Sequence, residues 1–233
     1  MFYYDPTMIV LIPAIIFALW AQSSVNSAFR KYSNVRNSLG ITGAEAARRI
    51  LDNNGLSDVP INVIGGGDLN NYYDPRDRSL NLSSEVYQSA SVSAVAVACH
   101  EVGHAIQHES GYTFLKLRNS IVPIVNFTQM LSWPLIIIGI LLTSVSAYGN
   151  LIFNIGVICF LFVIAFHLVT LPVELNASNR AIEQMTANGL VSSQDITGSR
   201  KVLRAAAMTY IAALATAIAN LLRILLIAGR RND

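Results

Sequence analysis

Charged residues are scarce in this sequence. Only 13% of its 233 residues are Asp, Glu, Lys or Arg, whereas 53% are hydrophobic; soluble domains average about twice that charged share. Residues 119–173 contain no Asp, Glu, Lys or Arg at all. A chain of this composition has too little polar surface to cover a water-soluble globule, and it is therefore predicted to be a membrane protein.

Cysteine and net charge are also low. The only cysteines are Cys99 and Cys159, too few for a disulfide framework, and they indicate a reducing compartment or two buried thiols. The net charge is +2 and the basic residues are spread along the chain, so no nucleic-acid role is indicated.

Residues 7–24 predict the first transmembrane helix, with Trp20 at an interfacial position. No basic segment precedes this run and no small-residue cleavage site clearly ends it, so we expect it to remain as an anchor. Basic residues follow it at Arg30, Lys31 and Arg36. The positive-inside rule therefore places residues 25–129 in the cytoplasm.

Residues 130–171 predict a transmembrane helical hairpin, divided by the polar break at residues 144–150. Its tip carries no basic residue, so we expect it outside, which returns the chain to the cytoplasm for residues 172–204. Residues 205–228 are apolar and are expected to form a fourth span rather than an interfacial helix, with Arg223 snorkelling or paired. The fourth span would place Arg230 and Arg231 on the far side, against the positive-inside rule.

The cytoplasmic segment contains an HExxH motif, formed by His100, Glu101 and His104. On a helix, residues four apart lie about 40° from each other, so both imidazoles can reach one metal ion. Zinc lowers the pKa of a bound water to about 7, and a carboxylate at the position of Glu101 can take the proton of that water. Cys99 lies about 100° around the helix from His100 and is a poor candidate ligand. The motif predicts metal-assisted amide hydrolysis.

The elements around the motif predict a small α+β region. Thr42 and Glu45 form a capping box at the start of a helix that ends at Asn54 and Gly55. Residues 60–64 and 80–82 have strand character, residues 72–77 are expected to form a turn, and Gly65, Gly66 and Gly67 end the first strand. A short helix begins near Ser83 and the motif helix begins at Ser91 or Ser93. Residues 80–82 could also align an extended substrate as one more edge strand, or be purely structural.

A catalytic zinc takes three protein ligands and leaves the fourth position for water. Glu174 is the best candidate for the third ligand because it stands where the apolar run ends, and Glu183 is the second candidate. Arg180, Asn176 or a tyrosine of the 72–73 pair could stabilise an oxyanion, although each is more simply a surface or packing residue. His167, inside a span, is expected to be structural.

Two segments carry a resemblance to a known family. The segments are HEVGHAIQ at residues 100–107 and LPVELNAS at residues 171–178, and the chain resembles bacterial membrane zinc metallopeptidases of the YugP type across nearly its whole length. It is more distantly similar to HtpX-type and CAAX prenyl membrane proteases, whose second motif is E-x-x-A-D. Ser178 stands where those relatives have Asp.

The resemblance implies a gluzincin-like site with one zinc ion per chain, held by His100, His104 and Glu174, and with Glu101 as general base. Ser178 or Asn176 would be a weaker partner for a ligand histidine than an Asp, which implies lower zinc affinity. The expected protein is a mainly α membrane protein of three to four transmembrane helices with a zincin-like α+β part. We expect an endopeptidase of the bacterial plasma membrane that acts on protein or peptide substrates, membrane proteins above all; the alternative is a catalytically silent zinc-binding scaffold or adaptor.

Overall fold

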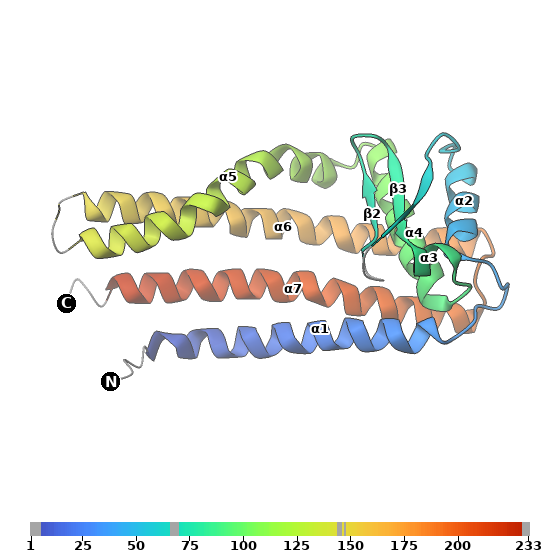
Figure 1. Ribbon diagram of the computed structural model, residues 1–233, viewed down its shortest axis with the longest axis horizontal. Coiled ribbons are helices and arrows are strands. Elements are labelled where there is room, and N and C mark those ends of the chain that lie inside the picture. Colours follow the sequence, from blue (N-terminus) through green and yellow to red (C-terminus); the bar gives the residue numbers. More distant parts are fainter. Residues whose placement is uncertain (1–5, 66–69, 144–145, 147, 230–233) are drawn as a thin grey trace. The chain divides into compact units, whose positions relative to one another are not determined.

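The computed structural model describes residues 6–65, 70–143, 146 and 148–229. Predictions that concern Gly66, Gly67, Arg230, Arg231 and residues 144, 145 and 147 of the hairpin tip therefore lie outside the described residues. The chain divides into two compact units (Figure 1). The helical unit comprises Met1–Trp20, Lys116–Leu171 and Thr209–Asp233, and the sheet-bearing unit comprises Ala21–Leu115 and Pro172–Met208.

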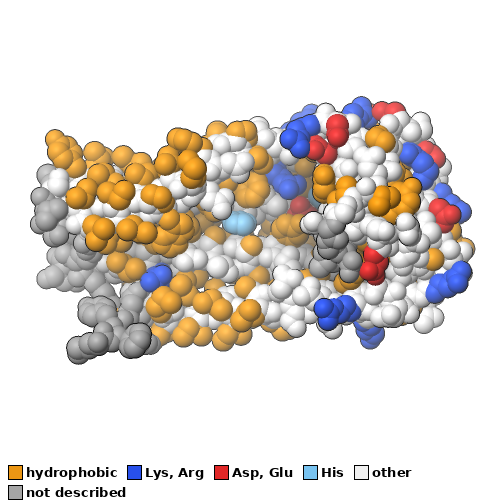
Figure 2. All heavy atoms as spheres, viewed as in Figure 1, with side chains coloured by type: hydrophobic (Ala, Val, Ile, Leu, Met, Phe, Trp, Pro, Cys, Tyr) orange, Lys and Arg blue, Asp and Glu red, His pale blue; other side chains and the backbone are white. Residues whose placement is uncertain are grey.

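Four long helices supply the helical unit: α1 (Ile12–Ser33), preceded by a 3-10 turn at Pro6–Leu11, α5 (Thr113–Leu142), α6 (Gly149–Ala187) and α7 (Ser193–Gly229). Among the described residues, these are the helices long and apolar enough to cross a membrane. Many large hydrophobic side chains of the unit are exposed, and on the face that Figure 2 shows they cover much of its outside. The prediction of a mainly α membrane protein with up to four spans and a small sheet is confirmed.

The helical unit has its own core and one polar contact that matches an expectation. Its buried cluster contains Ile136, Phe160 and Ile164. The Arg223 guanidinium donates a hydrogen bond to the Thr7 hydroxyl, so this arginine within the last apolar segment is paired rather than directed at lipid.

The ends of the long helices do not mark the predicted limits of the spans. Helix α5 begins at Thr113, well before residue 130, and α6 continues through Pro172 to Ala187. Segments predicted as membrane hairpin and cytoplasmic helix are therefore parts of one helix. A helix can continue out of the bilayer without a break, because its backbone N–H and C=O groups are already hydrogen-bonded to each other within the helix.

In the sheet-bearing unit, helix α2 (Gly43–Asn53) begins and ends as its sequence predicts. The Glu45 backbone donates to the Thr42 hydroxyl, and the Thr42 backbone donates to the Glu45 carboxylate. Gly55 follows the helix with a φ of 74°, the left-handed conformation that favours glycine. The apolar face of α2, which includes Ile50 and Leu51, is fully buried.

Three strands form the sheet in the order β1-β3-β2. Strand β1 (Ile61–Ile64) is parallel to β3 (Ser79–Ser83), and β2 (Tyr72–Asp74) is antiparallel to it. The prediction of a turn over residues 72–77 is thus wrong for its first half. Tyr72 and Tyr73 are good strand formers, and they pair with Asn81 and Leu80.

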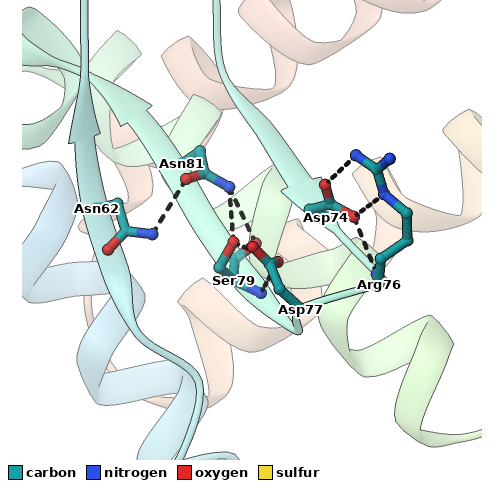
Figure 3. A network of polar contacts seen from close by, with 6 residues as sticks. All are labelled: Asn62, Asp74, Arg76, Asp77, Ser79 and Asn81. Atoms are coloured by element: carbon teal, nitrogen blue, oxygen red, sulfur yellow. Dashed lines mark hydrogen bonds and ion pairs between the residues drawn. The ribbon is translucent and has the colours of Figure 1, made fainter.

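The connection from β2 to β3 is held by side chains (Figure 3). Arg76 contacts the Asp74 carboxylate at 2.6 Å, and the Ser79 hydroxyl donates to Asp77 at 2.6 Å. The hydrogen bonds from Arg76 hold the pKa of the Asp74 carboxyl below its usual value. These contacts keep the hairpin tight without a glycine turn.

The strand at residues 80–82 is the middle strand of the sheet. Leu80 pairs with Ile61 on one side and with Tyr73 on the other. The expectation that these residues offer a free edge is therefore wrong, because neighbouring strands already occupy both edges. Within the described residues, β2 is an edge strand and β1 is the other.

Helix α3 (Ser84–Gln88) has Ser83 as its N-cap, and helix α4 (Val92–Glu109), which carries the HExxH motif, has Ser91 as its N-cap. Both starts agree with the sequence. Helix α4 is buried along nearly its whole length and packs into a core with α2, β3 and the end of α6. Because every turn of α4 is fixed by packing, its polar side chains are held in defined positions.

Candidate metal centre

Helix α4 brings the two motif histidines together. The ring centroids of His100 and His104 are 4.8 Å apart, with the rings nearly perpendicular. Glu174 of α6 completes the group, and the three potential ligand atoms all lie within 4.8 Å of one another. The Nε2 atoms of His100 and His104 lie 3.3 and 3.5 Å from the same atom, Oε2 of Glu174.

Gly103 allows α6 to approach this closely. A Cβ atom at Gly103 would lie 2.5 Å from the carbonyl oxygen of Ala177, a distance that real Cβ atoms do not adopt. The small residue sits between the two histidines on α4, and Ala177 is one helical turn beyond Glu174 on α6. The contact therefore sets the distance between the histidines and the carboxylate.

Gln107 fixes the protonation of His104. Its amide nitrogen donates to the backbone carbonyl of Val173 and to the side-chain oxygen of Asn176. A carbonyl can only accept, so the amide oxygen of Gln107 must face Nδ1 of His104, which lies 3.0 Å away. His104 is thus protonated on Nδ1, and in the neutral ring the Nε2 lone pair faces Glu174.

Ser178 contacts His100 as Gln107 contacts His104, at the Nδ1 atom of the ring. Its hydroxyl lies 3.1 Å from Nδ1 of His100, the contact that the sequence suggested. Both histidines therefore have neutral outer partners, an amide and a hydroxyl, in place of the carboxylate that often orients a metal-bound histidine.

The donor set fits a zinc ion. With the proton on Nδ1, the Nε2 lone pair of a neutral His104 would face the buried Oε2 of Glu174, and a cation between these two acceptors would stabilise both. Two imidazole nitrogens and one carboxylate oxygen are also the ligands of a catalytic zinc, which leaves one coordination position for water or substrate. His104 and Glu174 are 9% and 3% exposed, so the ion would be largely shielded from solvent.

Glu101 lies beside the group and is not a member of it. It is buried, and its carboxylate Oε2 accepts a hydrogen bond from the backbone N–H of Tyr73 in β2 at 3.1 Å. The Tyr73 hydroxyl in turn lies 2.9 Å from Nδ1 of His108, and burial raises the pKa of this phenol. Strand β2 is thereby attached to α4 at two points, which orients the Glu101 carboxylate.

The other residues considered from the sequence lie elsewhere. Glu183 is exposed and outside the group. Cys99 is fully buried, burial raises the pKa of its thiol, and it is not in the group. Arg180 donates to Asn176, and His167 contacts the Phe166 ring in the helical unit.

Sequence reasoning missed the roles of two residues, Gln107 as the partner of His104 and Tyr73 as the partner of Glu101. Gln107 carried a signal, because it follows His104 by three positions and shares its helix face. Tyr73 carried none, since its role depends on the pairing of β2 with β3.

Comparisons with known proteins agree with this geometry. A family described as "Putative neutral zinc metallopeptidase" matches residues 7–229. The chain is 46% identical over 216 residues to the protein named "Putative membrane protease YugP" of Bacillus subtilis (strain 168), covering 93% of each. No solved structure matches. The chain belongs to the YugP-type family of membrane zinc metallopeptidases, and zinc is the metal that this family implies.

Proposed function

We propose that this protein is a membrane-embedded, zinc-dependent endopeptidase that hydrolyses peptide bonds at the cytoplasmic membrane surface. One observation carries the proposal: His100, His104 and Glu174 converge from two helices, and a second glutamate, Glu101, stands beside them. A purely structural zinc site would need a fourth ligand and no base.

In this proposal His100, His104 and Glu174 hold the metal, and Glu101 is the general base. Bound zinc supplies a Lewis acid that acidifies water and polarises the substrate carbonyl. Glu101 accepts the proton of the attacking water and delivers it to the leaving amine. The Tyr73 backbone N–H holds the Glu101 carboxylate in place for both transfers.

We place the substrate along the outer edge of β2. The backbone N–H of Leu80 donates to Pro60, on the β1 side, and Tyr73 is opposite Leu80. Tyr73 therefore directs its own N–H away from the sheet, toward Glu101. An extended peptide added at this edge would lie next to the base, a role that β3 cannot take.

The cytoplasmic location rests on the charges along the sequence. Arg30, Lys31 and Arg36 follow the first apolar run, and residues 119–173 hold no charged residue. The positive-inside rule then places the metal-binding helix on the cytoplasmic side. Membrane proteins, or peptides near the membrane surface, are the proposed substrates.

The test combines metal content with cleavage, using detergent-purified protein and casein as an unstructured substrate. We expect about one zinc per chain in the wild type. Glu174→Ala loses zinc and cleavage, whereas Glu183→Ala, a matched change at an exposed position of the same helix, keeps both. Glu101→Gln keeps zinc and loses cleavage by roughly 10²- to 10⁴-fold.

The outcomes separate the alternatives. Zinc binding without cleavage of any substrate tested would favour the zinc-binding scaffold. In that case Glu101→Gln would leave the cellular role of the protein intact. Absence of zinc from the wild type would contradict the metal site itself.

A further inference from the structure

A cavity lies within the sheet-bearing unit, and none of the residues that line it belongs to the His100, His104 and Glu174 group. It has a volume of about 510 Å³ and lies between α1 and α7. Its lining includes Ser24, Ser27 and Lys31 of α1, and Lys201, Arg204 and Met208 of α7. The two helices lie side by side in this unit (Figure 1).

The lining residues form one continuous face on each helix. On α1 the face comprises positions 24, 27, 28, 31 and 32, and on α7 it comprises positions 201, 204, 205 and 208. These positions follow the spacing i, i+3, i+4, i+7, extended on α1 to i+8, which places the side chains of each set on one side of a helix. The cavity is thus a groove between two facing stripes.

The groove concentrates positive charge. Lys31, Lys201 and Arg204 all line it, and within the part of the chain that the structure describes, no carboxylate forms an ion pair with any of them. Helix α1 has no acidic residue, and the one acidic residue of α7 is Asp195, which accepts a hydrogen bond from Ser38. Three like charges around one space repel each other and favour a bound anion.

Polarity changes along the groove in a consistent direction. Lys31 and Lys201 mark one end, and Ser24 and Met208 mark the other. Beyond Ser24 toward its start, and beyond Met208 toward its end, each helix consists of largely apolar sequence. A ligand with a phosphate at the charged end and hydrocarbon at the apolar end matches this gradient.

We propose that the groove between α1 and α7 binds the phosphate of an anionic phospholipid, with Lys31, Lys201 and Arg204 as its cationic contacts and Ser27, one helical turn from Lys31, as a hydroxyl donor. Basic pockets between membrane helices commonly hold anionic headgroups. This site is independent of the proposed peptidase activity, and it would tie a unit that carries the metal centre to the charge of the surrounding lipid.

The test measures lipid binding by native mass spectrometry of the detergent-solubilised full-length protein. Phosphatidylglycerol and phosphatidylcholine are titrated separately, and inorganic phosphate is added as a competitor in a second arm. We expect one phosphatidylglycerol to bind, more tightly than phosphatidylcholine. If inorganic phosphate displaces phosphatidylglycerol and binds with the same affinity, the groove recognises the phosphate group alone. If millimolar inorganic phosphate does not displace it, the groove recognises the whole lipid.

Matched variants separate the groove from general surface charge. Lys31→Gln/Lys201→Gln removes two charges from the lining and is expected to weaken phosphatidylglycerol binding by roughly tenfold or more. Arg30→Gln/Arg200→Gln removes two charges one position away on the same helices, outside the lining, and should change binding by less than about twofold. Zinc content and circular dichroism verify that both variants are folded.

Two results overturn the proposal. An equal loss of phosphatidylglycerol binding in both double variants would mean that binding depends only on the overall charge of the protein. Failure of the wild type to bind either phosphatidylglycerol or inorganic phosphate would mean that the groove is not an anion site.

Discussion

At the scale of single residues, the geometry of the candidate metal centre depends on the two side chains that contact its histidines, Gln107 and Ser178. Gln107 orients His104 and also contacts the backbone of Val173, the residue before Glu174. One side chain thus connects His104 to the helix that carries Glu174. Ser178 makes the single outer contact at His100.

Ser178→Asp is expected to raise zinc affinity. A carboxylate accepting from Nδ1 of His100 makes the ring a stronger ligand, and outer partners of this kind change metal affinity by about 10- to 100-fold. Ser178→Ala should lower the affinity, because Nδ1 then loses its partner. Competition with a chromogenic chelator measures both, and equal affinities in all three proteins would contradict a role for residue 178.

Gln107→Glu is expected to weaken zinc binding although it keeps the shape of the side chain. The carboxylate can still accept from His104, but it cannot donate to the Val173 carbonyl or to Asn176, as the amide does. A buried, negatively charged group would then face two acceptors, at a cost of about 1–3 kcal/mol. The same chelator assay measures the loss, with Glu183→Gln on α6 as an exposed control. Unchanged affinity would show that the amide donors are dispensable.

At the scale of elements, the centre depends on the contact between α4 and α6. At Gly103 the two helices are too close for a Cβ atom, which would lie 2.5 Å from the carbonyl oxygen of Ala177. The buried faces of both helices then fix the spacing. Two helices far apart in sequence share one metal group because a residue without a Cβ stands between the histidines.

Gly103→Ala is expected to lower both stability and zinc content. Alanine favours a helix over glycine by about 1 kcal/mol, but the added methyl group would have to displace a backbone carbonyl, and overpacking of this kind costs about 1–3 kcal/mol. Thermal unfolding in detergent should show a lower Tm. Gly65→Ala is the control, because nothing lies within 4 Å of the added Cβ and its Tm should be unchanged. A Gly103→Ala protein with normal Tm and zinc would contradict the packing argument.

Local signals predicted the elements that depend on local interactions. The capping box of α2, the start of α4 at Ser91 and the two histidines on one helix face all follow from spacings of three or four residues. Strand β2 was not predictable, since Tyr72 and Tyr73 are followed by Asp74 and Pro75, a turn sequence. Its strand conformation comes from pairing with β3. The contacts of Gln107 to α6 are likewise a product of tertiary packing.

At the scale of the whole molecule, membrane topology decides which proteins can reach the metal centre. The proposed arrangement puts the sheet-bearing unit in the cytoplasm and the hairpin tip outside. Two exposed positions test it: Ser57, in a turn after α2, and Tyr148, beside the tip. Both can be replaced by cysteine in a background with Cys99→Ala and Cys159→Ala.

We expect a membrane-impermeant maleimide to label Tyr148→Cys in intact spheroplasts and Ser57→Cys only after lysis. A cytosolic marker protein verifies that the spheroplasts are sealed. The opposite pattern would place the metal centre outside the cell and would remove the proposed cytoplasmic substrates.

The last apolar segment allows a sharper test, because its two interpretations differ at its end. If α7 spans the bilayer, Gly229, exposed at its last position, lies outside. Gly229→Cys is then labelled in intact spheroplasts, as Tyr148→Cys is. If α7 instead lies at the interface, Gly229→Cys is labelled only after lysis, as Ser57→Cys is. We expect the first result, since α7 is apolar and long enough to cross and its Arg223 is paired with Thr7, which lowers the cost of a charge in the span.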